Sequence, residues 1–138
     1  MPEGPFQVEI VSPERPLFRG EAGSLVAASY DGEIGILPGH APLVSLLGSG
    51  LVRVDLGGAR SGEERFAIRG GFLQVLGKRV TLLVTQAARP GDVDPAKARA
   101  ALEKTVAELQ HPRTDADYER LLDERRWWES QLKLAAQA

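Results

Sequence analysis

The residues with the clearest catalytic potential lie in one short stretch, Asp31–Leu43, which reads DGEIGILPGHAPL. It holds His40, one of only two histidines in the chain, and the carboxylates of Asp31 and Glu33. A histidine oriented by a carboxylate can act as the general base of a hydrolase. That reaction also needs a nucleophile or a bound metal, yet the chain has no cysteine, no nucleophile-elbow motif and no pair of metal ligands at helical spacing. His40 is therefore interpreted first as a hydrogen-bonding turn residue, with the hydrolase as an alternative.

The same stretch is rich in residues that fix the path of the backbone, because glycine admits a positive φ and proline restricts φ. Its order predicts a hairpin turn at Asp31-Gly32, a short strand over 33–37 and a second turn at Pro38-Gly39. Two interpretations stay open. The stretch either presents a rigid edge to a partner, or forms two corner turns of an ordinary sandwich.

Alternating apolar residues separated by glycine-rich turns predict the architecture of the first part of the chain. Phe6, Val8 and Ile10 alternate with polar residues, which is typical of a half-buried strand. Further short strands, interrupted at 48–50 and 70–71, are predicted over residues 17–18, 25–29, 33–37, 43–47, 51–56, 65–68, 72–76 and 79–85. This spacing predicts an N-terminal antiparallel β-sandwich or flattened barrel over residues 1–89.

From residue 90 onward the composition predicts a C-terminal antiparallel two-helix hairpin, residues 90–138. Asp94 is a good N-cap, and Pro95 falls at the first helical position, where a missing N–H costs nothing. Thr114, with Asp117 three residues on, resembles a capping box at the start of a second helix. The two predicted helices cover residues 96–109 and 115–136.

The apolar face of each predicted helix is narrow. On the first helix it comprises Ala98, Leu102, Thr105, Val106 and Leu109. On the second it comprises Tyr118, Leu121, Leu122, Arg125, Trp128, Leu132 and Ala135. Such faces bury little surface, so we expect the hairpin to dock weakly on the sandwich, where a partner can displace it. The alternative is a static helical cap on the sheet.

The second helix also carries arginines and a tryptophan pair. Arg120, Arg125 and Arg126 could clasp an acidic surface, or they lie on a solvated face offset by nearby carboxylates. Trp127 and Trp128 point about 100° apart on a helix, so one indole can be buried while the other covers a different surface. An exposed indole is a reasonable interface anchor.

The composition excludes several function classes. With 17 basic and 19 acidic residues the formal charge is −2, which favours neither nucleic acid nor an anionic membrane surface. The sequence shows neither the basic-then-apolar order of a signal peptide nor an apolar run of the ~20 residues that a membrane span requires. We therefore expect a protein that stays in the compartment where it is made.

One segment resembles a family signature. Gly32–Leu43, GEIGILPGHAPL, is similar to the G-E-x-G-x-x-P-G-H-A-P-L motif of the epsilon subunit of bacterial and plastid F-type ATP synthases, called delta in mitochondria. Val8–Pro13 is similar to the first strand of that family, and Ile68–Val75 resembles its x-x-G-G-x-x-x-V segment. The order of sandwich and helical hairpin is also that of the family, so the resemblance covers essentially the whole chain.

The resemblance implies a non-catalytic rotor subunit of the central stalk, with no active site and no cofactor. Its sandwich is then expected to bind the gamma subunit and to rest on the c-ring, coupling rotation of the ring to the catalytic head. Glu33 occupies the position that faces the polar loops of the c-ring, and His40 lies in the same stretch. Ser12 and its neighbours match a segment placed against gamma. Such a protein is peripheral, bound through the complex at the cytoplasmic face of the cell membrane, or on the stromal side of a thylakoid.

In relatives the helical hairpin can extend along the stalk and block ATP hydrolysis. The resemblance therefore implies contacts with the catalytic alpha and beta subunits in an inhibited state. On this chain the candidates for those contacts are Arg120, Arg125, Arg126, Trp127 and Trp128.

Some relatives also bind ATP through an I/L-D-x-x-R-A motif. This chain has Val93, Asp94, Lys97 and Ala98 at the corresponding positions. Lysine replaces the arginine, which removes a planar bidentate contact to phosphate. We therefore expect no bound nucleotide. The alternative to a rotor subunit is a free-standing ligand-binding sandwich with a static helical cap.

Overall fold

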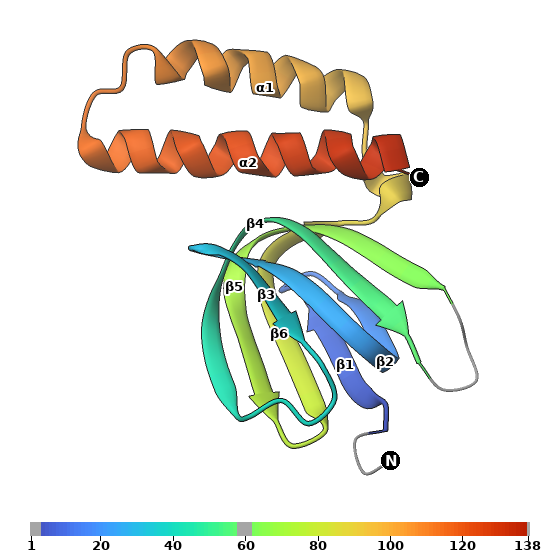
Figure 1. Cartoon of the computed structure of the whole chain (residues 1–138). Coiled ribbons are helices and arrows are strands. Elements are labelled where there is room, and N and C mark those ends of the chain that lie inside the picture. The colour runs from blue at the N-terminus through green and yellow to red at the C-terminus, as the bar shows by residue number, and fades with distance from the viewer. Residues whose placement is uncertain (1–3, 58–61, 138) are drawn as a thin grey trace.

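Six strands and two long helices make up the part of the chain that the computed structural model describes, residues 4–57 and 62–137. The strands form a flattened barrel, and the helices lie across one end of it (Figure 1). This arrangement confirms the predicted order of a β domain followed by a helical hairpin. The elements are β1 Phe6–Val11, β2 Pro16–Ser29, β3 Gly32–Ile36, β4 Leu43–Leu56, β5 Glu63–Leu76, β6 Arg79–Ala88, the 3-10 helix η1 Pro90–Asp92, α1 Pro95–Leu109 and α2 Asp115–Gln137.

The strand order is β1-β6-β5-β4-β2-β3, and an additional β1–β2 pairing closes the sheet on itself. β3 pairs with β2 and forms the edge of the sheet. The pairings are antiparallel with one exception, because β1 runs parallel to β6. The prediction of a purely antiparallel sheet is wrong for that pair. Side-chain alternation has the same period in both arrangements, so it carries no information on strand direction.

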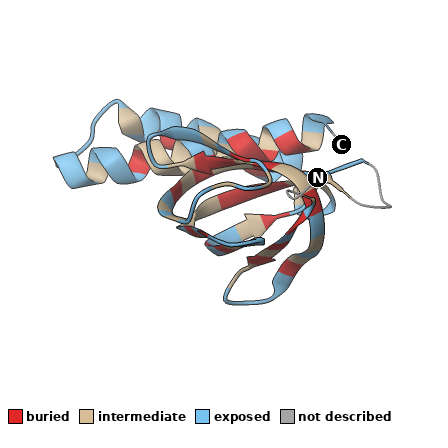
Figure 2. Ribbon diagram, turned by 60° about the horizontal axis from the view of Figure 1, so that its bottom comes forward, coloured by how far each residue is buried: buried red, intermediate tan, exposed pale blue. Residues whose placement is uncertain are grey.

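The barrel core is filled by the inward-facing side chains of alternate strand positions. Buried residues lie along the inner faces of the strands and along α2 (Figure 2). The predicted alternation is confirmed, since Val8, Val52, Phe66, Ile68 and Leu82 are almost wholly buried. Burial of a side chain of this size contributes about 1.5–3 kcal/mol, so this core is the main source of the stability of the barrel.

The predicted interruptions at 48–50 and 70–71 are wrong, because β4 and β5 run through them. The strands instead change register or bend there. Between Ala27 and Ser29 the register of β2 against β4 shifts, and the extra β4 residues form a bulge. At Gly71, which has φ +119°, an added Cβ would lie 1.9 Å from the carbonyl oxygen of Leu83. Glycine is therefore used here for close backbone approach within a strand rather than for a turn.

The helix starts agree with the predicted caps, with one change. The Asp94 carboxylate accepts the backbone N–H of Lys97 at 3.2 Å. Thr114 Oγ1 accepts the backbone N–H of Asp117 at 3.0 Å, as a capping box requires. The Asp117 carboxylate, however, accepts the N–H of Arg113 at 3.1 Å rather than that of Thr114.

The predicted helix faces are only partly correct. Ala98 and Thr105 of α1 are buried, but Val106 is 42% exposed. On α2 the buried side chains are Leu121, Trp127, Ser130, Gln131 and Leu134, whereas the predicted Tyr118 is exposed. The reason is that α2 lies between two surfaces, since it packs against α1 on one side and against β4, β5 and η1 on the other. A single stripe cannot describe a helix that buries two faces.

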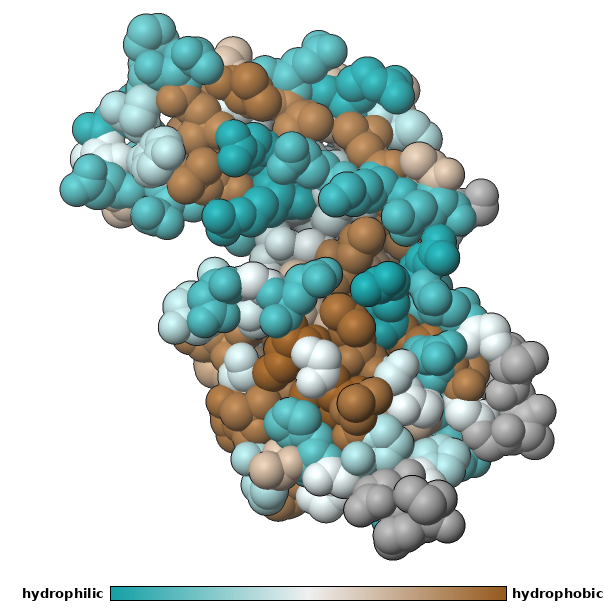
Figure 3. All heavy atoms as spheres, in the orientation of Figure 1, coloured by the Kyte–Doolittle hydropathy of each residue, from teal (hydrophilic) through white to brown (hydrophobic). Residues whose placement is uncertain are grey.

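The hairpin contacts the barrel through α2, and α1 packs on α2. Apolar surface lies between the helices and on the barrel, whereas the outer side of the hairpin is largely hydrophilic (Figure 3). Neither helix, over the residues that the structure describes, has the length and apolar character needed to span a membrane.

Replacement of Gly71 by alanine should destabilise the barrel. The new Cβ would meet the Leu83 carbonyl at 1.9 Å, and φ is positive, so both overpacking and backbone strain contribute, together at least about 2 kcal/mol of unfolding free energy. Urea denaturation measures the loss. Gly91→Ala is the matched control because Gly91 has no atom within 4 Å of a built Cβ, and it should leave the midpoint unchanged. Equal midpoints for both variants would contradict the role assigned to Gly71.

Candidate functional site

The stretch 31–43 does not assemble a catalytic pair. The backbone N–H of His40 donates to the Leu37 carbonyl at 3.1 Å, and its Nδ1 lies 2.7 Å from the Ala41 carbonyl oxygen. Asp31 accepts a hydrogen bond from Ser29 Oγ at 2.9 Å. Between them runs the extended strand β3, about 16 Å long at ~3.3 Å per residue. The structure therefore confirms His40 as a turn residue and does not bring it together with Asp31.

Ser12, Glu33 and His40, which the resemblance assigns to partner contacts, lie at different places on the barrel. Ser12 closes the β1–β2 turn, where its Oγ donates to the Arg15 carbonyl at 3.0 Å. Glu33 is exposed near the start of β3, the edge strand. His40 lies in the loop between β3 and β4, and this loop is at the end of the barrel away from the helices (Figure 1). The three residues therefore belong to different parts of the barrel surface.

The connection between barrel and hairpin is held by Asp92, which the sequence did not single out. Its carboxylate accepts the backbone N–H of Arg89 at 3.0 Å and the guanidinium of Arg15 at 2.7 Å. These contacts hold the pKa of Asp92 below its usual value, the Arg89 N–H contributing most. Arg89 also donates to the Leu17 carbonyl. The connecting segment 89–94, called the hinge below, is thus tied to the β1–β2 turn and to the start of β2.

The four residues at the positions of the ATP-binding motif have structural roles. Asp94 caps α1, and its carbonyl oxygen accepts the N–H of Ala98 at 2.9 Å. The Ala98 side chain is buried, and Val93 packs against the apolar cluster beneath α2. Lys97 contributes its backbone N–H to the cap.

The α2 arginines differ in their surroundings. Arg120 pairs with Asp117 at 2.8 Å and with Glu124 at 3.5 Å, and the hydrogen bond to Asp117 raises the pKa of Arg120. Arg125 Nε lies 3.8 Å from a carboxylate oxygen of Glu129. Both arginines thus form intrahelical pairs, and only Arg120 fits the solvated-face alternative, because Arg125 is half-buried and its Nε is removed from water without a hydrogen-bond partner among the described residues.

Arg126 is exposed and lies near the start of β3, the end of that strand opposite the loop that holds His40. It lines a groove together with Tyr30, Asp31 and Gly32 of the β2–β3 turn. The second helix therefore lies over the turn that begins the signature stretch.

The two indoles are buried to different degrees, and Trp128 borders α1 as well as the cluster that contains Trp127. Trp127 is only 6% exposed and packs in a cluster with Ala67, Ala88 and Leu134, between α2 and the barrel. Trp128 is half-buried and borders a groove lined by Ala101, Lys104 and Thr105 of α1, among others. Trp127 is therefore a docking residue in this conformation, and Trp128 lies at the α1–α2 contact.

Asp123 of α2 contacts the barrel, which the sequence did not predict. It is one of the carboxylates expected to offset the arginines on a solvated helix face. Its Oδ1 accepts a hydrogen bond from Ser49 Oγ of β4 at 2.7 Å, and its Oδ2 accepts one from Arg69 Nε of β5 at 3.3 Å. The available signal was spacing, because Asp123 lies one helical turn before Trp127 and shares its face.

The outer face of the barrel carries an exposed apolar row, defined here as Val11, Leu46, Phe72 and Leu83. In register Leu46 pairs with Phe72, Phe72 with Leu83 and Leu83 with Val11, so the row crosses β4, β5, β6 and β1. Phe72 is 53% exposed, and Leu46 and Leu83 are similarly open. A contiguous apolar row of this kind marks a protein contact.

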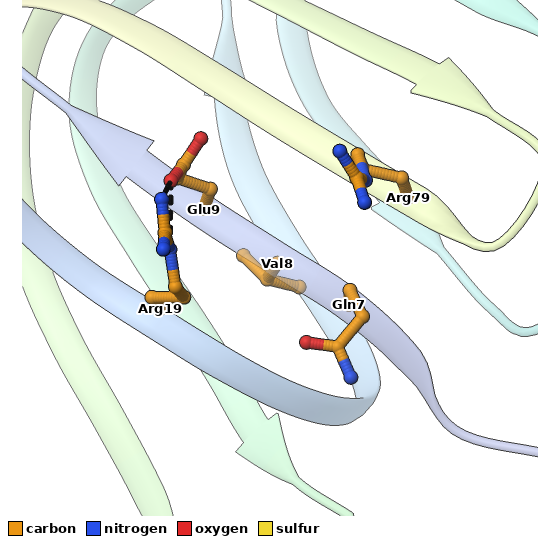
Figure 4. Close-up of a pocket in the computed structure, with 5 residues that line it drawn as sticks. All are labelled: Gln7, Val8, Glu9, Arg19 and Arg79. Carbon is orange, nitrogen blue, oxygen red and sulfur yellow. Dashed lines mark hydrogen bonds and ion pairs between the residues drawn. The ribbon is translucent and has the colours of Figure 1, made fainter.

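A shallow pocket near β1 offers no catalytic chemistry of its own (Figure 4). It is lined by Gln7, Val8, Glu9, Arg19 and Arg79, and has a volume of about 220 Å³. Arg19 pairs with Glu9 across the β1–β2 ladder, while Arg79 reaches the pocket from β6. Elsewhere in residues 4–57 and 62–137, no group of three or more histidine, aspartate or glutamate side chains is placed to hold a metal ion.

Comparison with known proteins gives consistent results. Residues 5–90 match the family model described as ATP synthase, Delta/Epsilon chain, beta-sandwich domain. The chain is 36% identical to the ATP synthase epsilon chain of Dichelobacter nodosus, over 96% of this chain and 92% of that one. It is 40% identical to the epsilon chain of Brevibacillus brevis, over 80% and 82% of the two chains.

Two solved structures share the fold. A chain in the cryo-EM structure of the mitochondrial ATP synthase of Euglena gracilis superposes with a TM-score of 0.77 at 23% identity, covering 96% of this chain and 83% of that one. A chain in the central stalk and c-ring structure from Tetrahymena thermophila gives a TM-score of 0.58 at 17% identity, covering 95% and 93%. At these identities the likeness concerns the fold, and it includes both barrel and hairpin.

Proposed function

Since the chain belongs to the ATP synthase delta/epsilon family, we propose that it acts as the non-catalytic central-stalk subunit of an F-type ATP synthase. In this role it couples rotation of the c-ring to the catalytic head. The observation that carries the proposal is the 36% identity to an epsilon chain, which extends through both the barrel and the hairpin. The subunit is peripheral, bound through the complex at the cytoplasmic face of the membrane.

The apolar row supports a contact with the gamma subunit. The row ends at Val11, directly before Ser12, the residue that the resemblance assigns to gamma. Leu46, Phe72 and Leu83 are exposed in the isolated chain, and a stable partner would remove them from water. Gamma therefore covers this face of the barrel.

Glu33 and His40, which lie at opposite ends of β3, are both assigned to contacts with the c-ring. Glu33 is exposed on the edge strand, so its carboxylate is free to meet a polar loop of the ring. The loop that holds His40 is fixed by prolines and by the hydrogen bond from the His40 N–H to Leu37. A fixed loop transmits torque better than a mobile one.

The free-standing ligand-binding module has less support. A small-molecule site is usually a largely apolar cavity with a few polar groups. In the described part of the chain, the groove of about 660 Å³ at the loop end of the hairpin is lined by Lys104, Ala107, Glu108, His111, Arg113, Asp117 and Arg120. Its lining is mainly charged, which does not favour that class of ligand.

The hairpin carries regulation. In the docked conformation Arg120 and Arg125 hold only intrahelical ion pairs, which contribute little when exposed and can be exchanged for carboxylates of another subunit. Trp127 becomes available as an anchor only when α2 leaves the barrel. Undocking thus exposes the indole and frees the arginines for an inhibitory contact with the alpha and beta subunits.

Substitution of Phe72 by glutamate should weaken the binding of gamma by at least tenfold. The change removes an apolar anchor and places a charge in the interface, while Phe72 is exposed in the free chain, so the fold should persist. Titration calorimetry with purified gamma measures the affinity, and circular dichroism checks the fold. Val106→Glu, at an exposed position on α1, is the control and should bind normally. Unchanged binding by the Phe72 variant would remove gamma from this face.

Truncation after Arg113 should raise ATP hydrolysis by the assembled enzyme, because it removes α2 with its arginines and indoles. A second variant, with Arg120, Arg125 and Arg126 changed to glutamine, keeps the helix and should raise hydrolysis as well. Co-purification with gamma controls for assembly. If hydrolysis stays at the level of the native enzyme in both variants, the hairpin is a static cap.

Nucleotide should bind weakly to the isolated chain. Asp94 is engaged in the cap of α1, Ala98 is buried, and Lys97 lacks the bidentate geometry of arginine. Calorimetry with ATP should give a dissociation constant in the millimolar range or weaker. Lys97→Arg is the matched variant, and it should bind more tightly. A micromolar constant for the native chain would contradict this proposal and make the hairpin an ATP sensor.

A further inference from the structure

The contact between α2 and the barrel contains one built polar site. The carboxylate of Asp123 accepts Ser49 Oγ at 2.7 Å and Arg69 Nε at 3.3 Å. Ser49 is 7% exposed, so its hydroxyl is largely removed from water. Hydrogen bonds to a charged group are about twice as strong as neutral ones, and they strengthen further as the site is desolvated.

Two glycine motifs place these donors beside each other. Ser49 lies between Gly48 and Gly50, where an added Cβ would come within 2.7 Å of the Ser29 carbonyl oxygen and of the Ala28 side chain respectively. Arg69 directly precedes Gly70 and Gly71. Gly70 has φ +59°, and Gly71 is the glycine that approaches the Leu83 carbonyl.

Ser49 and Arg69, beside these glycines, both contact Asp123 of α2, and β4 and β5 curve at the end of the barrel that α2 covers (Figure 1). The register pairs Leu47 with Gly71 and Gly50 with Ile68, so the two bends are adjacent. The bent strands therefore hold a hydroxyl and a guanidinium in one orientation, ready to receive a single carboxylate.

The apolar part of the same interface is small. Its buried members are Trp127 and Leu134 of α2 with Ala67 and Ala88 of the barrel, and the partly buried Leu51, Val93 and Trp128 pack against them. A further polar contact, from Arg65 to Gln137, is long at 3.4 Å and exposed. Within residues 4–57 and 62–137, Arg69–Asp123 is the only ion pair that joins either α-helix to the barrel. The polar site, in which the side chains of Arg69 and Asp123 are 25% and 41% exposed, thus adds a directional contact to this small apolar cluster.

We propose that Ser49 and Arg69 form a carboxylate-binding site on the barrel, and that occupation of this site by Asp123 sets the fraction of molecules with a docked hairpin. Undocking empties the site, because its ligand leaves with α2. The inference rests on the proposed function only in that the docked fraction then sets how much of the enzyme can be inhibited. The site itself is a property of the isolated chain.

Thiol labelling of the full chain measures the undocked fraction. The native sequence has no cysteine, so Ala67→Cys introduces a single thiol beneath Trp127. In this background Asp123→Asn should label about tenfold faster, because loss of a charge-assisted contact raises the open population by that order. Arg69→Gln should act similarly, and the double variant should label no faster than the quicker single one. Glu119→Gln, an exposed carboxylate change on α2, should have no effect.

A second thiol position separates undocking from unfolding. Ala22 is wholly buried in the barrel core, so a thiol introduced by Ala22→Cys reports loss of the barrel fold. Its labelling should be unchanged by Asp123→Asn. An unchanged rate at position 67, equal acceleration at both positions, or additive effects of the two substitutions would each overturn the proposal.

This experiment is independent of ATP hydrolysis. Faster labelling at position 67 together with unaltered hydrolysis after truncation would support the site and refute the regulatory function. A change in hydrolysis after truncation without faster labelling would support the regulatory function and refute the site.

Discussion

The close approach of Gly71 to the backbone of β6 is the constraint on which the rest of the structure depends. A side chain there would collide with the Leu83 carbonyl, so only glycine lets β5 bend while staying paired with both neighbours. The bend allows a sheet of few strands to close into a barrel. It also leaves Phe72 and Leu83 side by side on the outer face and sets Arg69 beneath α2. Core closure, partner surface and docking site thus share one local cause.

The two surfaces of the barrel differ in how firmly they hold what they contact. The outer face offers the row formed by Val11, Leu46, Phe72 and Leu83, which is apolar and contiguous, and which is exposed at Leu46, Phe72 and Leu83. The end that carries the hairpin offers Ala67, Ala88 and the partly buried Leu51, together with one polar site. Apolar area that is removed from water gives a stable contact, whereas a small interface with one ion pair gives a contact that can open. This difference suits a subunit that stays on the rotor while its hairpin changes conformation.

The location of the hinge agrees with such a change. Asp92 ties the segment between β6 and α1 to Arg15 of the β1–β2 turn, so the root of the hairpin stays fixed to the barrel. The pKa of Asp92 is lowered by these contacts, so its carboxylate stays ionised to a lower pH than that of a free aspartate. Movement is then expected in α1 and α2, beyond the hinge. The outer surface of these helices is largely hydrophilic, so it can stay in contact with water in any position of the hairpin.

The sequence by itself determined the classes of structure and the order in which they occur. The alternation of residues such as Val52, Val54 and Phe66 predicted the inward faces of strands, and the Asp94-Pro95 pair predicted where α1 begins. Those features depend on neighbours in the chain, so they can be read locally. The signature around Gly32–Leu43 added the family, which the comparisons confirm through a family model over residues 5–90 and a relative that covers 96% of the chain.

Only the tertiary structure decided what depends on contacts between distant residues. In the folded chain β4 and β5 continue through glycines whose local sequence resembles a turn. At these glycines the neighbouring strand leaves no room for a side chain. The tertiary structure buried Trp127 on the barrel and turned Trp128 toward α1, since α2 packs against two surfaces at once. It also made Asp123 a ligand of Ser49 and Arg69, 74 and 54 residues away in sequence. No local pattern contains such pairings, because they arise only when the chain closes on itself.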